Sequence, residues 1–259
     1  MVSPRNNIQI RRNNIRTLLA GIKEKGPISK RDLQKLTGLS WGAVSSLTGV
    51  LYEHKYIMPV GKQVTNVGRK PSEFDINSDE HFIIGIDLNL SGLYGVVADM
   101  KGRIIREWHR LFLRNEKDSV MEMLLSLIQD MIEDAAGKHI VGIGMAVQGI
   151  VDLENGVSVL FPHVQNWKDV PLKKIIEAKF GIFTLLRHDP DCLMIAEKVF
   201  GESFMSIAEN AVMLRIDNGI GMSMLINGKL YCGAEGKTGE FGHIPVSRDG
   251  PVCVCGNRG

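Results

Sequence analysis

The sequence predicts an α/β protein with two domains, a small helical domain over residues 1–76 and a larger domain over residues 77–259. Its length of 259 residues is sufficient for two hydrophobic cores. From residue 82 onward, strand-like segments alternate with helix-like segments, which is the pattern of α/β layers. The third observation is an uneven distribution of charge.

Residues 1–72 contain 13 Lys and Arg and only 3 Asp and Glu, whereas the remainder holds the other 18 of 31 basic residues and 26 of 29 acidic residues. A basic segment on an acidic body indicates a polyanion partner for that segment, with a generic solvated basic face as the alternative. The sequence has neither a run of about 18 apolar residues nor a signal peptide, so we expect a cytoplasmic protein. The 4 Cys predict no disulfide framework.

Three short helices are expected in the N-terminal domain. The apolar stripe of the first consists of Ile15, Leu18, Leu19 and Ile22. Ser29 can cap the second helix, which Thr37-Gly38 ends, and Ser40 can cap the third. The inward residues of the third helix are expected to be Val44, Leu47 and Leu51. A tight turn containing Gly between the second and third helices is typical of a helix-turn-helix.

The outer face of the third helix is expected to contact DNA. Its candidate residues are Ser40, Trp41, Gly42, Ser45, Ser46 and Thr48. Small hydroxyl side chains allow a helix to lie deep in the major groove and to bond base edges and phosphates.

Two short strands around a polar turn follow, over residues 56–77, and predict the wing of a winged helix. Arg69 and Lys70 lie in a compact basic turn that can enter a minor groove. Two alternatives remain for this region: a charged linker, and a winged helix that binds protein.

The body predicts helices over residues 121–135, 172–180 and 191–202. Residues 82–108 predict two long strands, with tight turns at Ser91-Gly92 and Lys101-Gly102. Hairpins are expected around residues 154–156 and over residues 210–233.

Several segments of the body occur in the order and spacing of one family. They are IDLNLSGLYGVVADMKG, GIGMAVQGIVDLENGV, HDPDCLMIAEKVFGE, the stretch from NGIGMSMLINGKL to GEFGHIPV, and CVCGNRG. Residues 82–259 resemble the ROK family, which groups bacterial sugar kinases with sugar-responsive repressors. The resemblance implies an actin-like (ribonuclease H-like) domain of the sugar-kinase type, and residues 8–76 resemble the winged helix of the repressor branch.

The resemblance implies a regulator and not an enzyme, because both phosphate turns of the kinases are altered. Leu90 would crowd a phosphate where the kinases have glycine, and Asp217 would repel one at the second turn. No ATP binding is therefore expected. A ROK sugar kinase that carries a DNA-binding module is the alternative.

By resemblance, Asp189 matches the catalytic base of the kinases, and Glu240 and His243 match their sugar-contacting pair. Carboxylates and an imidazole suit the hydroxyls of a sugar. His163 and His188 replace sugar-site Asn residues of the family, as Asp191 does at a later position. Effector-binding residues are thus expected at His163, His188, Asp189, Glu240 and His243. An unusual, charged or phosphorylated sugar, or no ligand, remains open, as does a structural role for these acids.

The resemblance also implies a zinc site formed by His243, Cys253 and Cys255. A structural zinc site takes four N or S ligands, and the fourth Cys of the family pattern would fall at position 260. We therefore expect the chain to be incomplete within the motif, with zinc in a longer parent and zinc left open here. Cys192 and Cys232 are interpreted as packing residues.

The sequence hypothesis is a DNA-binding transcriptional regulator, a repressor of carbohydrate-metabolism genes controlled by a sugar or sugar derivative. Operator DNA and a second copy in a homodimer or homotetramer are the expected partners. A non-functional remnant is a third hypothesis.

Overall fold

The computed structural model describes residues 4–61, 72–135, 137–162, 164–201, 208–217, 219–233, 238–253 and 256–258. It divides into two compact units, a first unit of Met1–Phe82 with Ala98–Ile104 and a second unit of Ile83–Val97 with Ile105–Gly259. The predicted boundary after residue 76 differs from this division. The turn Ala98–Ile104 belongs to the first unit because Met100 packs against its core and Lys101 Nζ lies 2.6 Å from Asp75 Oδ2.

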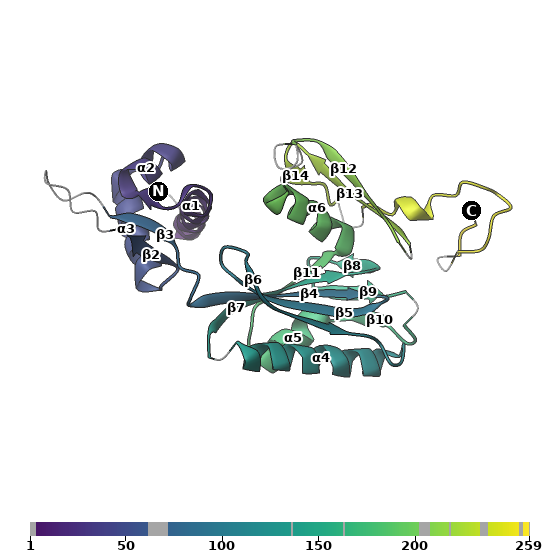
Figure 1. Ribbon diagram of the computed structural model, residues 1–259. Helices are drawn as coiled ribbons and strands as arrows, with labels where there is room; N and C mark the ends of the chain where they lie inside the picture. Colours follow the sequence, from purple (N-terminus) through teal and green to yellow (C-terminus); the bar gives the residue numbers. More distant parts are fainter. Residues whose placement is uncertain are drawn as a thin grey trace, which may run out of the picture. The chain divides into compact units, whose positions relative to one another are not determined.

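The first unit contains three helices and three short strands among its described residues (Figure 1). In chain order these are α1 (Pro4–Lys25), β1 (Ile28–Ser29), α2 (Lys30–Thr37), α3 (Trp41–Glu53), β2 (Ile57–Val60) and β3 (Glu73–Ile76). The strands form an antiparallel sheet in the order β1-β3-β2. Ser29 and Ser40 cap α2 and α3, as predicted, by accepting hydrogen bonds from the backbone N–H groups of Asp32 and Ala43.

One apolar cluster holds this unit together. Its buried members are Leu18, Ile22, Ile28, Leu33, Val44, Leu47, Leu51, Ile57 and Ile76. The predicted stripe of α1 and the three predicted inward residues of α3 are thus confirmed. Each fully buried leucine or isoleucine contributes about 1.5–3 kcal/mol relative to exposure, so the small sheet and the three helices depend on one shared core.

The second unit is built on a five-stranded sheet in the order β11-β7-β4-β5-β6. The strands are β4 (His81–Asn89), β5 (Gly92–Asp99), β6 (Ile104–Arg110), β7 (His139–Val147) and β11 (Thr184–His188). The prediction of two strands over residues 82–108 is wrong, because the chain reverses again after β5 and forms β6. A smaller antiparallel sheet consists of β8 (Ile150–Asp152), β9 (Val157–Leu160) and β10 (Lys168–Val170).

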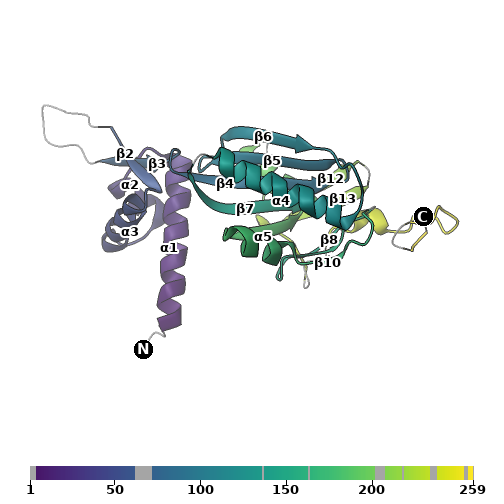
Figure 2. The same ribbon diagram turned by 90° about the horizontal axis from the view of Figure 1, so that it is seen from below.

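Helices α4 (Lys117–Asp134) and α5 (Leu172–Phe180) cover one face of the five-stranded sheet (Figures 1 and 2). The inward side chains of α4 are Val120, Leu124, Leu127, Ile128 and Met131. Helix α5 has its predicted bounds, whereas α4 begins four residues before the predicted start at residue 121. Of the helices formed by the described residues, none combines the length and the apolar character that a membrane crossing requires.

Helix α6 (Asp189–Phe200) lies on the opposite face and contacts β7 and β11 as well as a third sheet. That sheet consists of β12 (Ala211–Ile216), β13 (Ile220–Ile226) and β14 (Lys229–Leu230), all antiparallel. Helix α6 starts at Asp189 and not at the predicted residue 191, because Pro190 suits the first turn of a helix, where its missing N–H leaves no bond unmade.

Candidate functional sites

The N-terminal end of α3 presents polar and aromatic groups on the surface of the first unit. Trp41 is 52% exposed, and Gly42 and Ser46 are also exposed. Ser45 is half-buried and its Oγ lies 3.5 Å from Lys30 Nζ, which brings the start of α2 beside α3. Ser40 caps α3 and stands exposed at the edge of the same face.

Thr48 does not belong to this face, and its predicted outward position is wrong. Its side chain is 0% exposed, and Oγ1 donates to the carbonyl oxygens of Val44 at 2.7 Å and Ser45 at 3.1 Å. Thr48 follows the inward Val44 by four residues, which places both on the same side of the helix. The predicted residues Arg69 and Lys70 lie outside the described residues.

A cavity of about 660 Å³ lies beside Trp41 within the first unit. Its lining residues are Lys30, Arg31, Gln34, Trp41, Ser72 and Phe74. The Lys30 ammonium lies 5.7 Å from the centre of the Phe74 ring. Sequence reasoning missed the start of α2 as part of this surface, although the pair Lys30-Arg31 directly after the capping Ser29 gave a signal: two cations and a helix N-terminus attract an anion together.

In the second unit, Asp189 lies at the start of α6 and is 5% exposed. His188 Nε2 is 3.3 Å from its Oδ1. Burial lowers the pKa of His188, and the Glu240 and Asp191 carboxylates oppose this effect. The structure therefore places His188 against Asp189, and Glu240 and Asp191 near enough to act on the charge of His188. Asp191 Oδ1 accepts a hydrogen bond of 2.6 Å from Ser223 Oγ. The predicted residue His163 lies outside the described residues.

Arg215 on β12 completes this cluster, and sequence reasoning missed it. Its Nη1 donates to Asp189 Oδ2, and its Nη2 donates to Asp217 Oδ2 at 3.2 Å. An alternating strand gave no reason to single out one Arg that lies 26 residues from Asp189. Only the packing of β12 and β13 against α6 reveals the ion pair.

Asp87 near the end of β4 is a half-buried acid that Arg215 also influences. Its Oδ1 is buried and has no hydrogen-bond partner among the described residues, whereas Oδ2 accepts from Asn89 Nδ2 at 2.8 Å. Burial raises the pKa of this carboxyl, and the Asn89 hydrogen bond and the Arg215 charge lower it only in part. A raised carboxyl pKa reports unfavourable burial of the charged form.

The turn after β4 uses its backbone amides internally. The N–H of Leu90 donates to Gln148 Oε1 at 2.9 Å, and the N–H of Ser91 donates to Asn89 Oδ1 at 2.8 Å. Phosphate binding at such a turn requires free N–H groups. The N–H groups of Leu90 and Ser91 are thus both bonded to side chains.

The segment Gly239–His243 is anchored on β13. Gly239 has φ 87°, and a Cβ there would lie 2.0 Å from the Met222 carbonyl oxygen, so only glycine allows this approach. The anchored turn holds Glu240 Oε2 3.6 Å from His243 Nε2. The other ring nitrogen of His243, Nδ1, lies 3.7 Å from Cys253 Sγ.

Two of the predicted zinc ligands are thus adjacent, and Cys255 lies outside the described residues. Zn–S and Zn–N bonds of about 2.3 and 2.0 Å in a tetrahedral site place the two ligand atoms roughly 3.5 Å apart, so the distance between this pair is compatible with one ion. Within the described part of the chain, no three His, Cys, Asp or Glu side chains converge as a metal site.

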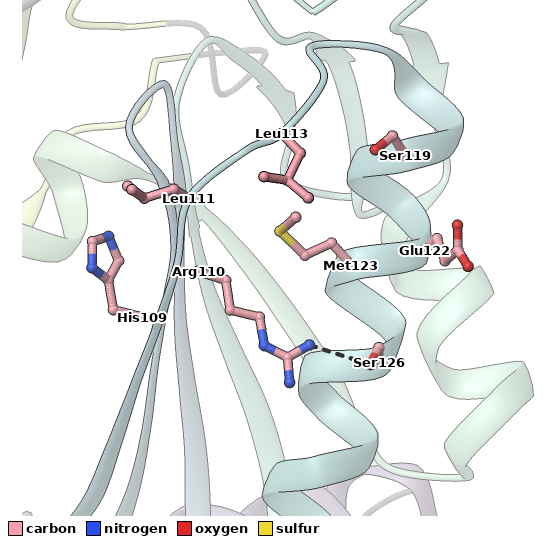
Figure 3. A pocket seen from close by; sticks show the side chains of 8 residues that line it. All are labelled: His109, Arg110, Leu111, Leu113, Ser119, Glu122, Met123 and Ser126. Atoms are coloured by element: carbon pink, nitrogen blue, oxygen red, sulfur yellow. Dashed lines mark hydrogen bonds between the residues drawn. The ribbon is translucent and has the colours of Figure 1, made fainter.

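The cavity in Figure 3, of about 710 Å³, lies apart from all predicted residues, between the end of β6 and α4. Leu113 and Met123 face each other across it, and Arg110 Nη1 donates to Ser126 Oγ at 3.2 Å. Its walls hold no cluster of acids or metal ligands, and we assign it no part in the chemistry of the Asp189 cluster.

Known proteins resemble both units. The chain is 32% identical over 254 residues to the xylose repressor of Bacillus spizizenii, and the match covers 96% of this chain and 65% of the repressor. It is 28% identical over 242 residues to the DNA-binding transcriptional dual regulator NagC of Escherichia coli K12, covering 92% of this chain and 58% of that protein. The chain therefore spans less than two thirds of the length of these relatives.

Among solved structures, a ROK family transcriptional regulator described as a homolog of the E. coli MLC protein superposes with a TM-score of 0.83. It is 25% identical, and the match covers 96% of this chain and 63% of that one. A ROK family glucokinase from Streptomyces griseus in complex with glucose and AMPPNP gives a TM-score of 0.60 at 25% identity, covering 69% of this chain and 55% of that one. The model of the ROK family matches residues 83–259, which is most of the chain, and the chain belongs to the ROK family.

Proposed function

We propose that this protein is a sugar-responsive transcriptional regulator that binds operator DNA as a repressor. The observation that carries the proposal is the likeness to named repressors and to a ROK transcriptional regulator over more than nine tenths of the chain, first unit included. The glucokinase likeness covers only 69% of the chain.

The first unit is the DNA-binding part in this proposal, as a winged helix. Helices α2 and α3 correspond to a helix-turn-helix, with α3 as the recognition helix and β2 and β3 as the base of the wing. Trp41, Ser45 and Ser46 face the major groove, while Lys30 and Arg31 contact phosphates beside them. Arg69 and Lys70 lie between β2 and β3 in the sequence, and we propose that they contact the minor groove.

The second unit binds the effector near Asp189 and does not phosphorylate it. The carboxylate that matches the catalytic base is paired with Arg215, and the amides of Leu90 and Ser91 are bonded to side chains. A general base must be able to take a proton from the substrate hydroxyl, and an ion-paired carboxylate has little tendency to do so. Sugar binding then shifts the population between DNA-binding and non-binding states of a homodimer or homotetramer.

Zinc is proposed as a structural metal, held by His243, Cys253 and Cys255. Bound there, the ion would fix the segment that carries Glu240 and so influence the effector site. Zinc content of the purified protein by mass spectrometry, with Cys253→Ser as the comparison, tests this role. One zinc per chain that the substitution removes supports it, and equal metal content in both proteins contradicts it.

The decisive experiment is fluorescence anisotropy on DNA from the region upstream of the protein's own gene, with and without a panel of sugars and sugar phosphates. We expect specific binding that falls steeply with salt, because phosphate contacts release counterions. One sugar should alter the affinity. Equal binding to unrelated DNA at every salt concentration would contradict the proposal, and phosphorylation of any hexose from ATP would favour the kinase.

Matched variants locate the DNA surface. Trp41→Ala should weaken operator binding by about tenfold, the equivalent of about 1.4 kcal/mol. Tyr52→Ala is the control, because Tyr52 is 54% exposed at the other end of α3. Arg69→Ala should also weaken binding, and unchanged affinity would remove the proposed minor-groove contact.

A further inference from the structure

Arg215 is placed by the sheet and not by a flexible loop. It pairs with Gly221 of β13 in the antiparallel register, and a Cβ on Gly221 would lie 2.7 Å from the Pro190 Cγ of α6. Val212, Leu214 and Ile216 point to the exposed face of β12, so Arg215 points to the other face, toward α6. Its guanidinium therefore has a fixed approach to Asp189.

Both arms of this guanidinium are engaged by carboxylates. Nη1 lies against Asp189, and Nη2 lies 3.2 Å from Asp217 Oδ2 in the turn after β12. By resemblance, Asp189 matches the catalytic base of the kinases, and Asp217 stands at their second phosphate turn. Arg215 thus contacts both the carboxylate that matches the sugar side of a kinase site and the one that stands on its phosphate side. Its side chain is 21% exposed, which leaves an edge for a ligand.

The charges around this pair are mostly negative. Asp87, Asp191 and Glu240 interact electrostatically with members of the cluster, in addition to the two carboxylates bound by Arg215. Arg215 and the largely buried imidazole of His188 are basic groups of this cluster, and the imidazole of His243 lies beside Glu240, with its Nε2 3.6 Å from Oε2.

We propose that Arg215 is the specificity-determining residue of this site: with Asp189 it forms a donor–acceptor pair for one hydroxyl of an uncharged sugar, and the site rejects phosphorylated sugars. This inference rests on the proposed sugar-effector role of the second unit. It also assigns Arg215 a direct contact with the ligand.

The chemistry of a hydroxyl fits this pair. A sugar hydroxyl donates one hydrogen bond and accepts others, so it can donate to Asp189 while it accepts from Arg215. The Asp189–Arg215 pair carries no net charge, and an uncharged ligand leaves this balance intact. A phosphate can be bound bidentately by arginine, but here it would compete with Asp189 and Asp217 for both arms and face their repulsion.

Isothermal titration calorimetry on the full chain tests the proposal with matched pairs. The probes are D-xylose, D-glucose and N-acetylglucosamine, and D-xylose 5-phosphate, D-glucose 6-phosphate and N-acetylglucosamine 6-phosphate. We expect at least one uncharged sugar to bind, and its phosphate to bind at least about tenfold more weakly. Tighter binding of a phosphate, or binding of none of the six probes, would overturn the proposal.

Three variants separate a ligand contact from a structural role. Arg215→Met should lower the affinity for the uncharged sugar by at least about tenfold, and Arg215→Lys should lower it less because one donor and the charge remain. Asp217→Asn should shrink the affinity ratio between sugar and sugar phosphate, since one repelling carboxylate is gone. A merely structural Arg215 would leave that ratio unchanged in Arg215→Met and Arg215→Lys.

Lys229→Met on β14 is the control, because it removes a cation from the same unit but outside the cluster, and it should change neither affinity nor ratio. Circular dichroism checks that each variant is folded.

Calorimetry involves no DNA, so loss of operator binding with sugar selectivity retained would contradict the proposed regulator and not the role of Arg215. If a sugar controls operator binding normally but the affinity ratio between sugar and sugar phosphate is unchanged in Asp217→Asn, the proposed selectivity of the site is contradicted and the proposed regulator is not.

Discussion

The outer face of α3 and the Asp189–Arg215 cluster are both rich in hydrogen-bonding groups, yet they are assembled differently. The residues of the first, from Ser40 to Ser46, lie within two turns of one helix and are largely exposed. The second joins the start of α6 to β12 across 26 residues, and Asp189 is 5% exposed. A surface on one helix depends on local periodicity, whereas a buried ion pair depends on how elements pack. Substitutions should therefore affect the two regions differently.

The largest expected effect is loss of the first unit's core. Leu18→Ala removes a fully buried side chain and should lower the free energy of unfolding by about 2–5 kcal/mol. Hydrogen exchange measured by mass spectrometry should show the loss of protection within Met1–Phe82 and little change in α4 and α5. Leu36→Ala, at a 46% exposed position of α2, is the control and should change stability by less than about 0.5 kcal/mol. Equal loss of protection in both units would show that they unfold together.

The ion pair of the second unit should show strong coupling. Asp189→Asn leaves Arg215 without its main counter-ion, and Arg215→Met leaves a buried carboxylate. The free energies of unfolding lost in the two single variants should therefore add up to more than the loss in the double variant. A double-mutant cycle in urea should give a coupling free energy of about 1–3 kcal/mol. A value near zero would mean that Asp217 or solvent replaces the lost partner.

A smaller effect is expected from His188 as the pH falls. Burial lowers the pKa of this imidazole from its ordinary value of 6.5, so below that pH the unfolded chain binds a proton that the folded chain does not. The free energy of unfolding should then decrease more in the wild type than in His188→Asn as the pH falls through 6.5. Parallel pH profiles of the two proteins would contradict this.

The smallest effect is expected at Thr48. Thr48→Val keeps the shape of the buried side chain and removes its hydroxyl bonds to Val44 and Ser45, so stability should change by less than about 1.5 kcal/mol. Operator affinity should not change, because the side chain is 0% exposed. Ser46→Ala on the exposed face should instead lower the affinity. Equal losses of operator affinity in both variants would mean that α3 acts on DNA through its packing and not through its outer face.

The sequence by itself determined the features that depend on neighbours along the chain. The caps Ser29 and Ser40, the inward residues of α1 and α3, the bounds of α5 and the β8–β9 hairpin all follow from local periodicity and turn chemistry, and the structure confirms them. The motifs of the second unit were specific enough to indicate the ROK family, which the family model confirms. By resemblance, the sequence also predicted an effector site that includes His188, Asp189 and Glu240, and that role stays a prediction.

Only the tertiary structure decided which groups meet. Arg215 looked like any polar residue of an alternating strand until α6 and β12 packed against each other, and the use of the Leu90 amide by Gln148 joins residues 58 apart. Thr48 was misplaced because the outer face was inferred from polarity, and a hydroxyl that bonds the preceding turn can be buried at little cost. Contacts of this kind depend on distances in space, and one sequence records only distances along the chain.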